Sequence, residues 1–509
     1  MKKTISLVLS FILCFGFVFS VSAADDDAYT IRNPYASVNW ETVSQYKTAL
    51  HSHTNASDGS STLKESIERH VETGFDIIAV TDHGTVDYSW EKGPSRNLVK
   101  SLLSVAGRSK GDIVYLGSEG TFANGVSYTY STAENGDQYL NADGRTILKM
   151  PYGIENNAIS VNAHVNSWFV DYSDNSVTIY EDAVTGVDAA GGLCVINHPG
   201  EYTKARYELR TENAYDENNP AYSYYINKFA YLIENYDALI GIDMNSKGDA
   251  RTRFDRKLWD ILLSRFAANG ETLYAIASSD AHHLGVLDSG FTLLLMNDLT
   301  SAEARRSLES GEFFAASHCI GNLDELQDIA AALLKYYGSD NDVYKKVSAT
   351  AEAMTEKIEG IENGDLKADE SIGIEYSVLD SDGYTTVSTF PKVTSINVDD
   401  SENTIEINSE NAMIVRFISE GKVFETKSAD AAVIDLDDYA GEIGNYVRAE
   451  IFGEGGIVYT QSFTLNADEN AGKSSVVKGS YFNLGFLDFL LAEFHHWFNI
   501  IVRWVSNLF

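Results

Sequence analysis

The sequence predicts an α/β barrel of about seven strands, and two observations support this fold class. Between residues 45 and 318, a short apolar run, a polar loop and a segment of helical periodicity follow one another about seven times. Alternating strands and helices are typical of a parallel sheet, and this many units favour a closed or nearly closed barrel. Histidines and carboxylates also recur directly after the apolar runs. Because the carboxyl ends of barrel strands converge on one face, we expect these residues to meet there.

The candidate strands are apolar runs, and helices can be recognised between several of them. The runs cover residues 48–50, 76–80, 113–116, 159–161, 193–196, 238–242 and 273–277. After the first run, Leu63, Ile67 and Val71 share one helical face. Thr62 and Glu65 have the spacing of a capping box, which predicts that a helix begins there.

Further segments follow the predicted barrel. Residues 319–370 show a polar helical pattern and form a helical insert or linker. Residues 371–466 contain alternating runs, for example 404–407 and 446–451, separated by Gly- and Asp-rich turns. This pattern predicts a small β-sandwich-like domain. Residues 467–480 are a polar linker, which indicates that the segment after them is a detached element.

The final segment, residues 481–509, is strongly apolar and has a helical period. Its apolar positions form a wide face, whereas charges such as Asp488, Glu493 and Arg503 interrupt the sequence. A membrane-spanning helix needs about 20 mostly apolar residues without such charges. The pattern therefore predicts an amphipathic helix that lies on a membrane surface or self-associates, with Trp497 and Trp504 at the interface.

The first 23 residues resemble a targeting signal. Lys2 and Lys3 precede an apolar run, and small residues around Ala23 suit a signal peptidase. We therefore expect a secreted or extracellular protein, perhaps better described as cell-surface associated if the tail binds a membrane. The two remaining cysteines, Cys194 and Cys319, do not form the pattern of a disulfide framework.

The overall charge restricts the partners. The formal net charge is -36, which repels nucleic-acid backbones and argues against an extended nucleic-acid partner. A small anionic substrate remains compatible with this charge, because bound divalent cations reverse its sign locally.

Nine potential metal ligands lie at or just beyond the predicted strand ends. They are His51, His53, Asp58, His83, Glu119, His164, His198, Asp280 and His282. One ion takes only four to six ligands, so nine donors suit two or three divalent ions. The many histidines favour Zn, Mn or Fe over Mg or Ca.

The order of these motifs resembles the PHP (polymerase and histidinol phosphatase) superfamily. The resemblance covers about residues 45–318 and rests on His51-Ser52-His53-Thr54, Thr81-Asp82-His83, Asn197-His198-Pro199 and Ser279-Asp280-Ala281-His282. It implies a distorted seven-stranded barrel with three metal ions. By that resemblance, His51, His53, Glu119 and Asp280 hold one ion, and Glu119 bridges to a second ion held by His164 and His198. Asp58, His83 and His282 hold the third.

The resemblance also implies an activity. A hydroxide that bridges two ions would hydrolyse phosphomono- or phosphodiesters, with Glu119, Asp280 and His282 as catalytic residues. The same metal chemistry serves carbamates, carboxylic esters and amides, so this alternative stays open, as does a non-catalytic surface binding protein. Asp82 is either a turn residue or a carboxylate that orients a liganding imidazole.

Basic and amide side chains after the strands are candidates for substrate binding. The candidates are Lys204, Arg206, Asn245, Lys247, Arg251 and Arg253. Cationic side chains near a metal site would bind the anionic part of a small phosphoester.

Overall fold

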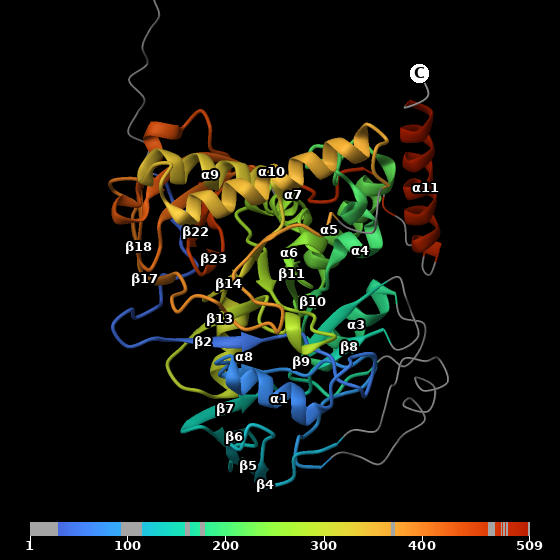
Figure 1. Cartoon of the computed structure of the whole chain (residues 1–509), viewed down its shortest axis with the longest axis vertical. Helices are drawn as coiled ribbons and strands as arrows, with labels where there is room; N and C mark the ends of the chain where they lie inside the picture. The colour runs from blue at the N-terminus through green and yellow to red at the C-terminus, as the bar shows by residue number, and fades with distance from the viewer. Residues whose placement is uncertain are drawn as a thin grey trace, which may run out of the picture.

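Two sheets carry the strands that position the predicted donors (Figure 1). The computed structural model describes residues 29–92, 114–157, 163–173, 179–367, 372–466, 474–479, 481, 484 and 487–506. The larger sheet includes, side by side, β13 (Gly290–Met296), β2 (Ser44–Ala49), β3 (Ile77–Ile78) and β7 (Arg145–Lys149). The second sheet has the order β12 (Tyr274–Ala277), β11 (Leu239–Asn245), β10 (Leu193–Ile196), β9 (Val165–Trp168) and β8 (Ile154–Asn156).

The strands mix parallel and antiparallel pairs. β2, β3 and β7 are parallel neighbours, and so are β10, β11 and β12. By contrast, β13 runs antiparallel to β2, and β9 runs antiparallel to both β8 and β10. The fold is therefore a mixed α/β arrangement with a large sheet, rather than one regular ring of seven parallel strands.

Two single bridges connect the sheets where the donor residues lie. Ser52 pairs with Ala281, and His83 pairs with Glu155, both in parallel orientation. Each bridge joins the end of a strand in one sheet to a segment of the other. The strand ends of both sheets consequently face a common region.

The first predicted helix is present with its predicted cap. α1 (Leu63–Glu72) begins after Thr62, whose side chain accepts a hydrogen bond from the Glu65 backbone, while the Glu65 side chain accepts one from Thr62. Leu63, Ile67 and Val71 are buried against the barrel. α3 (Tyr180–Ala190), α5 (Pro220–Asn235), α7 (Asp255–Ala267) and α8 (Ser301–Ser310) are the other helices of eight or more residues in the described part of this region.

One predicted strand is absent from the described residues. Residues 114–116 have no strand, and the chain continues into a meander of β4 (Glu119–Thr121), β5 (Ser127–Thr132), β6 (Gln138–Ala142) and β7. Neighbouring strands of this meander are antiparallel. The predicted run at 159–161 and the predicted signal peptide at 1–23 lie outside the described residues.

The C-terminal β region is continuous with the barrel sheet. Two helices, α9 (Leu323–Tyr337) and α10 (Asp342–Glu362), form the predicted helical segment. After them, β23 (Gly456–Tyr459) pairs with β14 (Phe313–Ser317) of the barrel region. β17 (Lys392–Asp399), β18 (Thr404–Glu410) and β21 (Val433–Asp435) form a separate three-stranded sheet. The remaining strands, β19 (Ile414–Ser419), β20 (Lys422–Ser428), β22 (Tyr446–Gly453) and β24 (Phe463–Leu465), belong to the large sheet, where β24 also pairs with β1 (Ile31–Arg32).

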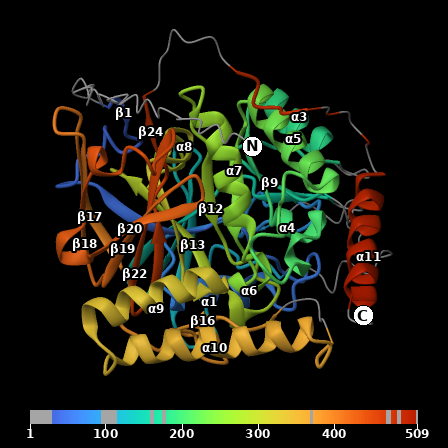
Figure 2. The same cartoon turned by 90° about the horizontal axis from the view of Figure 1, so that it is seen from above.

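The last helix, α11 (Asp488–Ser506), lies at the edge of the molecule beside α4 (Pro199–Thr203) and α5 (Figures 1 and 2). The expectation of a detached element is wrong for the described residues. Lys478 and Ser474 of the preceding segment hydrogen-bond to Asn227 and Asn269, respectively. The described part of the chain contains no helix long and apolar enough to cross a membrane.

Candidate metal centre

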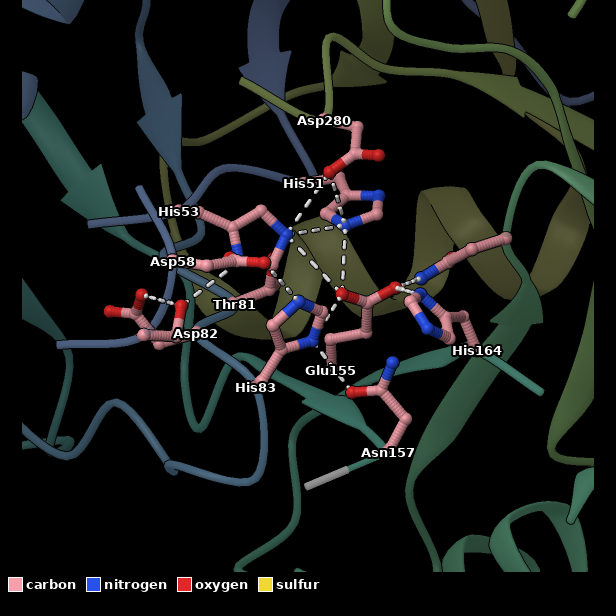
Figure 3. Close-up of polar contacts among 12 residues, drawn as sticks. His51, His53, Asp58, Thr81, Asp82, His83, Glu155, Asn157, His164 and Asp280 are labelled. Carbon is pink, nitrogen blue, oxygen red and sulfur yellow. Dashed lines mark hydrogen bonds and ion pairs between the residues drawn. The ribbon is translucent and has the colours of Figure 1, made fainter. Parts of the chain in front are cut away.

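Histidines and carboxylates from separate strand ends meet in one buried cluster (Figure 3). Seven of its members are almost completely buried: His51, His53, His83, Glu155, His164, His198 and Asp280. Two others, Asp58 and His282, keep about a third of their side-chain surface exposed, at 31% and 32%. The cluster is therefore closed on the protein side and open at Asp58 and His282.

The first group of donors consists of His51, His53, Glu155 and Asp280. The two histidine Nε2 atoms lie 3.1 Å apart. Asp280 Oδ1 lies 3.2 and 3.1 Å from them, and Glu155 Oε2 lies 3.5 and 3.3 Å from them. Four ligands that surround an ion in a tetrahedron, with bonds of about 2.0–2.1 Å, are about 3.3–3.4 Å apart. These four side chains thus have the separations of a tetrahedral site.

The second group uses the other oxygen of Glu155. Glu155 Oε1 lies 2.7 Å from His164 Nδ1 and 3.6 Å from His198 Nε2. His198 Nε2 is also 3.4 Å from Asp280 Oδ2. Glu155 and Asp280 consequently each present one oxygen to the first group and the other to the second.

The third group lies at the open side of the cluster. Asp58 Oδ2 is 3.2 Å from His83 Nε2, and Asp58 Oδ1 is 3.2 Å from His282 Nε2. His53 Nδ1 lies 3.8 Å from Asp58 Oδ1, which connects this group to the first. The short loop that returns Asp58 to His53 depends on Gly59, because a Cβ there would lie 2.7 Å from the His53 carbonyl carbon.

The protonation equilibria show that the cluster attracts positive charge. Burial lowers the pKa of His51, but Asp280 and Glu155 outweigh burial and raise it to about 10. For His83 burial is likewise outweighed, by Glu155 and Asp58, and its pKa also rises to about 10. Burial raises the pKa of Glu155, yet His164, His83 and His51 hold it well below its usual range. Metal ions compete with protons for such groups, so the cluster can exchange bound protons for divalent cations.

Several buried atoms of the cluster also have no hydrogen bond. Both ring nitrogens of His198 and the Glu155 Oε2 atom are in this state. Buried polar atoms are usually hydrogen-bonded, and atoms that are not often bind an ion. Together with the imidazole and carboxylate chemistry, this fits divalent ions of the Zn, Mn or Fe type.

A family model described as the PHP domain matches residues 49–344, which is more than half of the chain. The chain belongs to the PHP domain family. The match confirms the family that the motifs suggested, and it extends beyond residue 318 through α9. No curated protein matches the chain.

Two solved structures have similar chains, at low identity. One is a two-domain protein from Bacteroides vulgatus ATCC 8482, described as containing a predicted PHP-like metal-dependent phosphoesterase. It shares 14% identity with a TM-score of 0.34, covering 84% of this chain and 88% of that one. The other is a lesion-specific endonuclease, PfuEndoQ, from Pyrococcus furiosus, with 12% identity, a TM-score of 0.29, and coverage of 52% and 56%, respectively.

Within this PHP domain, Glu119 does not join the cluster, and Glu155 lies where Glu119 was expected. Glu119 is exposed on β4 and pairs with Thr129 in the meander, on the far side of β5, β6 and β7 from β3. The expectation failed because residues 117–149 form hairpins instead of one barrel strand. The turn sequences Asn135-Gly136 and Asp143-Gly144, which favour two-residue hairpins, were the available signal.

Further residues of the PHP domain hold the donors in place. Asp82 accepts hydrogen bonds from the Thr54 backbone (2.8 Å) and the Ser57 hydroxyl (2.5 Å), and Ser57 lies 3.3 Å from His53 Nδ1. Asp82 therefore fixes the loop that carries His53 and Asp58, rather than contacting an imidazole itself.

Three of these supporting contacts were not expected from the sequence. Asn157 Oδ1 lies 2.6 Å from His83 Nδ1, the Tyr202 hydroxyl lies 2.5 Å from His164 Nε2, and Asn197 donates to Glu155 Oε1 at 2.8 Å. Hydrogen bonds of this kind fix the orientation and tautomer of liganding imidazoles.

The backbone is strained at residues of the cluster. His198 has a φ of 27° and Asp280 a φ of 43°, both in the left-handed region that residues with a Cβ rarely adopt. Lys204 and Lys247, which lie next to the cluster, also have positive φ values of 66° and 58°. Such strain persists where the surrounding structure enforces it, and it is typical of functional sites.

A cavity of about 270 Å³ opens onto the cluster, and three of the predicted substrate-binding residues line it. These are Lys204, Arg206 and Lys247. A neighbouring cavity of about 470 Å³ shares Lys247, Asp280 and His282 with the first and adds Arg251. Glu201 also lines the first cavity and contacts Lys247 (2.9 Å) and Arg206 (3.0 Å).

The other two candidates do not line these cavities. The buried Arg253 guanidinium donates to the carbonyl oxygens of Ala250 and Glu208, both at 2.7 Å. Asn245 is buried at the end of β11. Their assignment to substrate binding is wrong in this structure, because both side chains are enclosed by the protein.

Proposed function

We propose that the protein is a metal-dependent phosphoesterase that hydrolyses small phosphomono- or phosphodiesters. The observation that supports this most is the set of three connected donor groups, linked by Glu155 and Asp280, beside a cavity with cationic side chains. His51, His53, Glu155 and Asp280 would hold one ion. Glu155, His164 and His198 would hold a second, and Asp58, His83 and His282 a third. Bound divalent ions would stabilise charge on a phosphoryl oxygen and lower the pKa of water.

The chain's own residues then position the substrate. Lys247 Nζ lies 2.9 Å from Asp280 Oδ2, so an anion bound there would be next to the donors. Lys204 and Arg206 lie on the same cavity and would bind further anionic oxygens. The volume of about 270 Å³ suits a small ester group rather than a long polymer.

The two adjoining cavities support acceptance of diesters as well as monoesters. Both are bordered by Lys247, Asp280 and His282, so a phosphoryl group there has space on two sides. A monoester would occupy one cavity, whereas a diester would place one alcohol group in each.

The test is metal analysis followed by a substrate panel. Purified protein is analysed for Zn, Mn and Fe, and then assayed with aryl phosphomonoesters, aryl phosphodiesters, and carbamate and carboxylic esters. The proposal expects metal-dependent turnover of phosphate esters. Turnover confined to the carbamate or carboxylic esters would replace it with the alternative hydrolase activity. Metal binding without turnover of any class would favour a binding protein.

Secretion is a second part of the proposal. Residues 1–23 have the pattern of a signal peptide, with cleavage after Ala23 or Ala24. N-terminal sequencing of protein from the culture medium of the producing cell tests this. A mature chain that still begins at Met1 would contradict it.

A further inference from the structure

The polar side of α11 faces the protein, and much of its apolar side faces solvent. Asp488 at its first turn forms an ion pair with the buried Lys228 and accepts a hydrogen bond from the Tyr224 hydroxyl at 2.7 Å. One turn and two turns later, Glu493 contacts Lys204 (2.6 Å) and Asn499 contacts Glu208 (3.2 Å). These contacts fix the helix in one rotation about its axis.

The opposite side presents large apolar side chains. Phe494, Trp497 and Phe498 are 71%, 59% and 55% exposed. Leu490, Ile501 and Val505 lie on the same side and are 50%, 56% and 40% exposed. We call these six residues the outer face of α11. An ordinary surface helix buries its apolar side, so this orientation indicates that something other than the described chain covers the outer face.

We propose that the outer face of α11 inserts into the interface of an uncharged, zwitterionic lipid surface. Aromatic rings such as those of Phe494, Trp497 and Phe498 are characteristic of the boundary between headgroups and acyl chains. The helix lies at the edge of the molecule in both views, so a flat surface can reach it (Figures 1 and 2).

Charge determines which lipid surface is expected. Helices that bind anionic membranes carry several Lys or Arg residues on the polar face. Residues 488–506 contain one Arg and no Lys, and the chain as a whole has a net charge of -36. An anionic surface would repel the protein, whereas a zwitterionic surface would not.

The dimensions of the outer face argue against a second copy as its occupant. A 19-residue helix is about 28 Å long and about 10 Å wide, so one face has a footprint of roughly 300 Å². Each partner in a standard stable interface buries about 800 Å². Two copies would also bring two strongly negative chains together, which adds repulsion.

The test uses substitutions on the outer face of the full chain. Deleting α11 would uncover the buried Lys228, so it would mix folding with binding. The variant F494S/W497S/F498S/I501S changes solvent-facing side chains only. The matched control L334S/V433S removes exposed apolar side chains (45% and 41% exposed) from α9 and β21.

Co-sedimentation with phosphatidylcholine vesicles measures the binding. We expect the unmodified chain and the control to bind, and the outer-face variant to bind roughly tenfold or more weakly. Adding phosphatidylglycerol to the vesicles should weaken binding at low salt. Equal unfolding temperatures of the three proteins check that the fold is intact.

Three results would overturn the proposal. The first is no sedimentation of the unmodified chain with phosphatidylcholine vesicles. The second is equal binding by the outer-face variant. The third is a concentration-dependent dimer in sedimentation velocity that the variant lacks and that vesicles do not dissociate, which would assign the face to a second copy.

Discussion

Replacing Glu155 by Gln tests the central assignment of the site. Glu155 is completely buried and lies at the junction of two donor groups. Its Oε2 faces His51, His53 and His83, and its Oε1 faces His164 and His198. Gln has almost the same shape but carries no charge, so the variant removes an anionic ligand from both groups without creating a cavity.

The size of the effect follows from those contacts. A contact with a charged group contributes about 1.5–3 kcal/mol. Glu155 offers one oxygen to each group, so the loss amounts to about 3–6 kcal/mol, or roughly 10²–10⁴-fold in combined metal affinity. We expect a loss of activity of the same order, because turnover in the proposed mechanism requires the ions.

The matched control is Glu119→Gln. Glu119 is exposed on β4, away from the cluster, so its amide variant should keep full metal content and activity. Metal stoichiometry by elemental analysis and hydrolysis of an aryl phosphate are measured for both variants, with thermal unfolding as the folding check. A large loss in Glu119→Gln, or unchanged metal content in Glu155→Gln, would refute the assignment of the bridging carboxylate.

Three further predictions concern the ions, the substrate pocket and the fold. Exhaustive chelation should abolish hydrolysis, and Mn or Zn should restore it; full activity without metal would count against the proposed chemistry. Lys247→Met should raise KM about tenfold or more while the metal content stays constant, and an unchanged KM would remove Lys247 from substrate binding. Burial lowers the pKa of His70 from 6.5 to about 4, so its stabilising contribution is complete above pH 6.5 and is lost as the pH falls toward 4. From pH 7 to 4 the unmodified chain should therefore lose about 3 kcal/mol more unfolding free energy than His70→Phe, and parallel pH profiles would contradict this.

Local signals in the sequence predicted local structure well. The capping box at Thr62 and Glu65 specifies its own two hydrogen bonds within four residues, and α1 begins as expected. Strands β2, β3, β10, β11 and β12 coincide with apolar runs because each is buried within the sheets. These elements depend on nearby residues, so the sequence contains the information directly.

Pairings between distant segments were not readable in the same way. The alternating pattern of 371–466 indicated strands, but nothing local showed that β23 would pair with β14, about 140 positions earlier. This pairing joins the C-terminal β region to the large sheet. Alternation identifies which residues are buried on one side of a strand, whereas the choice of partner depends on the whole fold.

The histidines of the site were predictable, and its central carboxylate was not. His51 and His53 are two positions apart in an extended segment, so both side chains point to the same side. Glu155, by contrast, follows a hairpin meander whose length no motif specifies. Its position is fixed by the bridge between His83 and Glu155, which is a contact across 72 positions of the chain.

The tail shows the same distinction between a pattern and its use. The helical period of residues 481–509 predicts two unlike sides, but it does not determine which side the protein contacts. The buried Lys228 on α5 decides this, because a buried ammonium group needs a carboxylate partner and Asp488 provides it. Once that pair forms, Phe494 and Trp497 lie on the solvent side. The charged residues that interrupt the apolar segment are thus the ones that attach the helix to the protein and expose its apolar side.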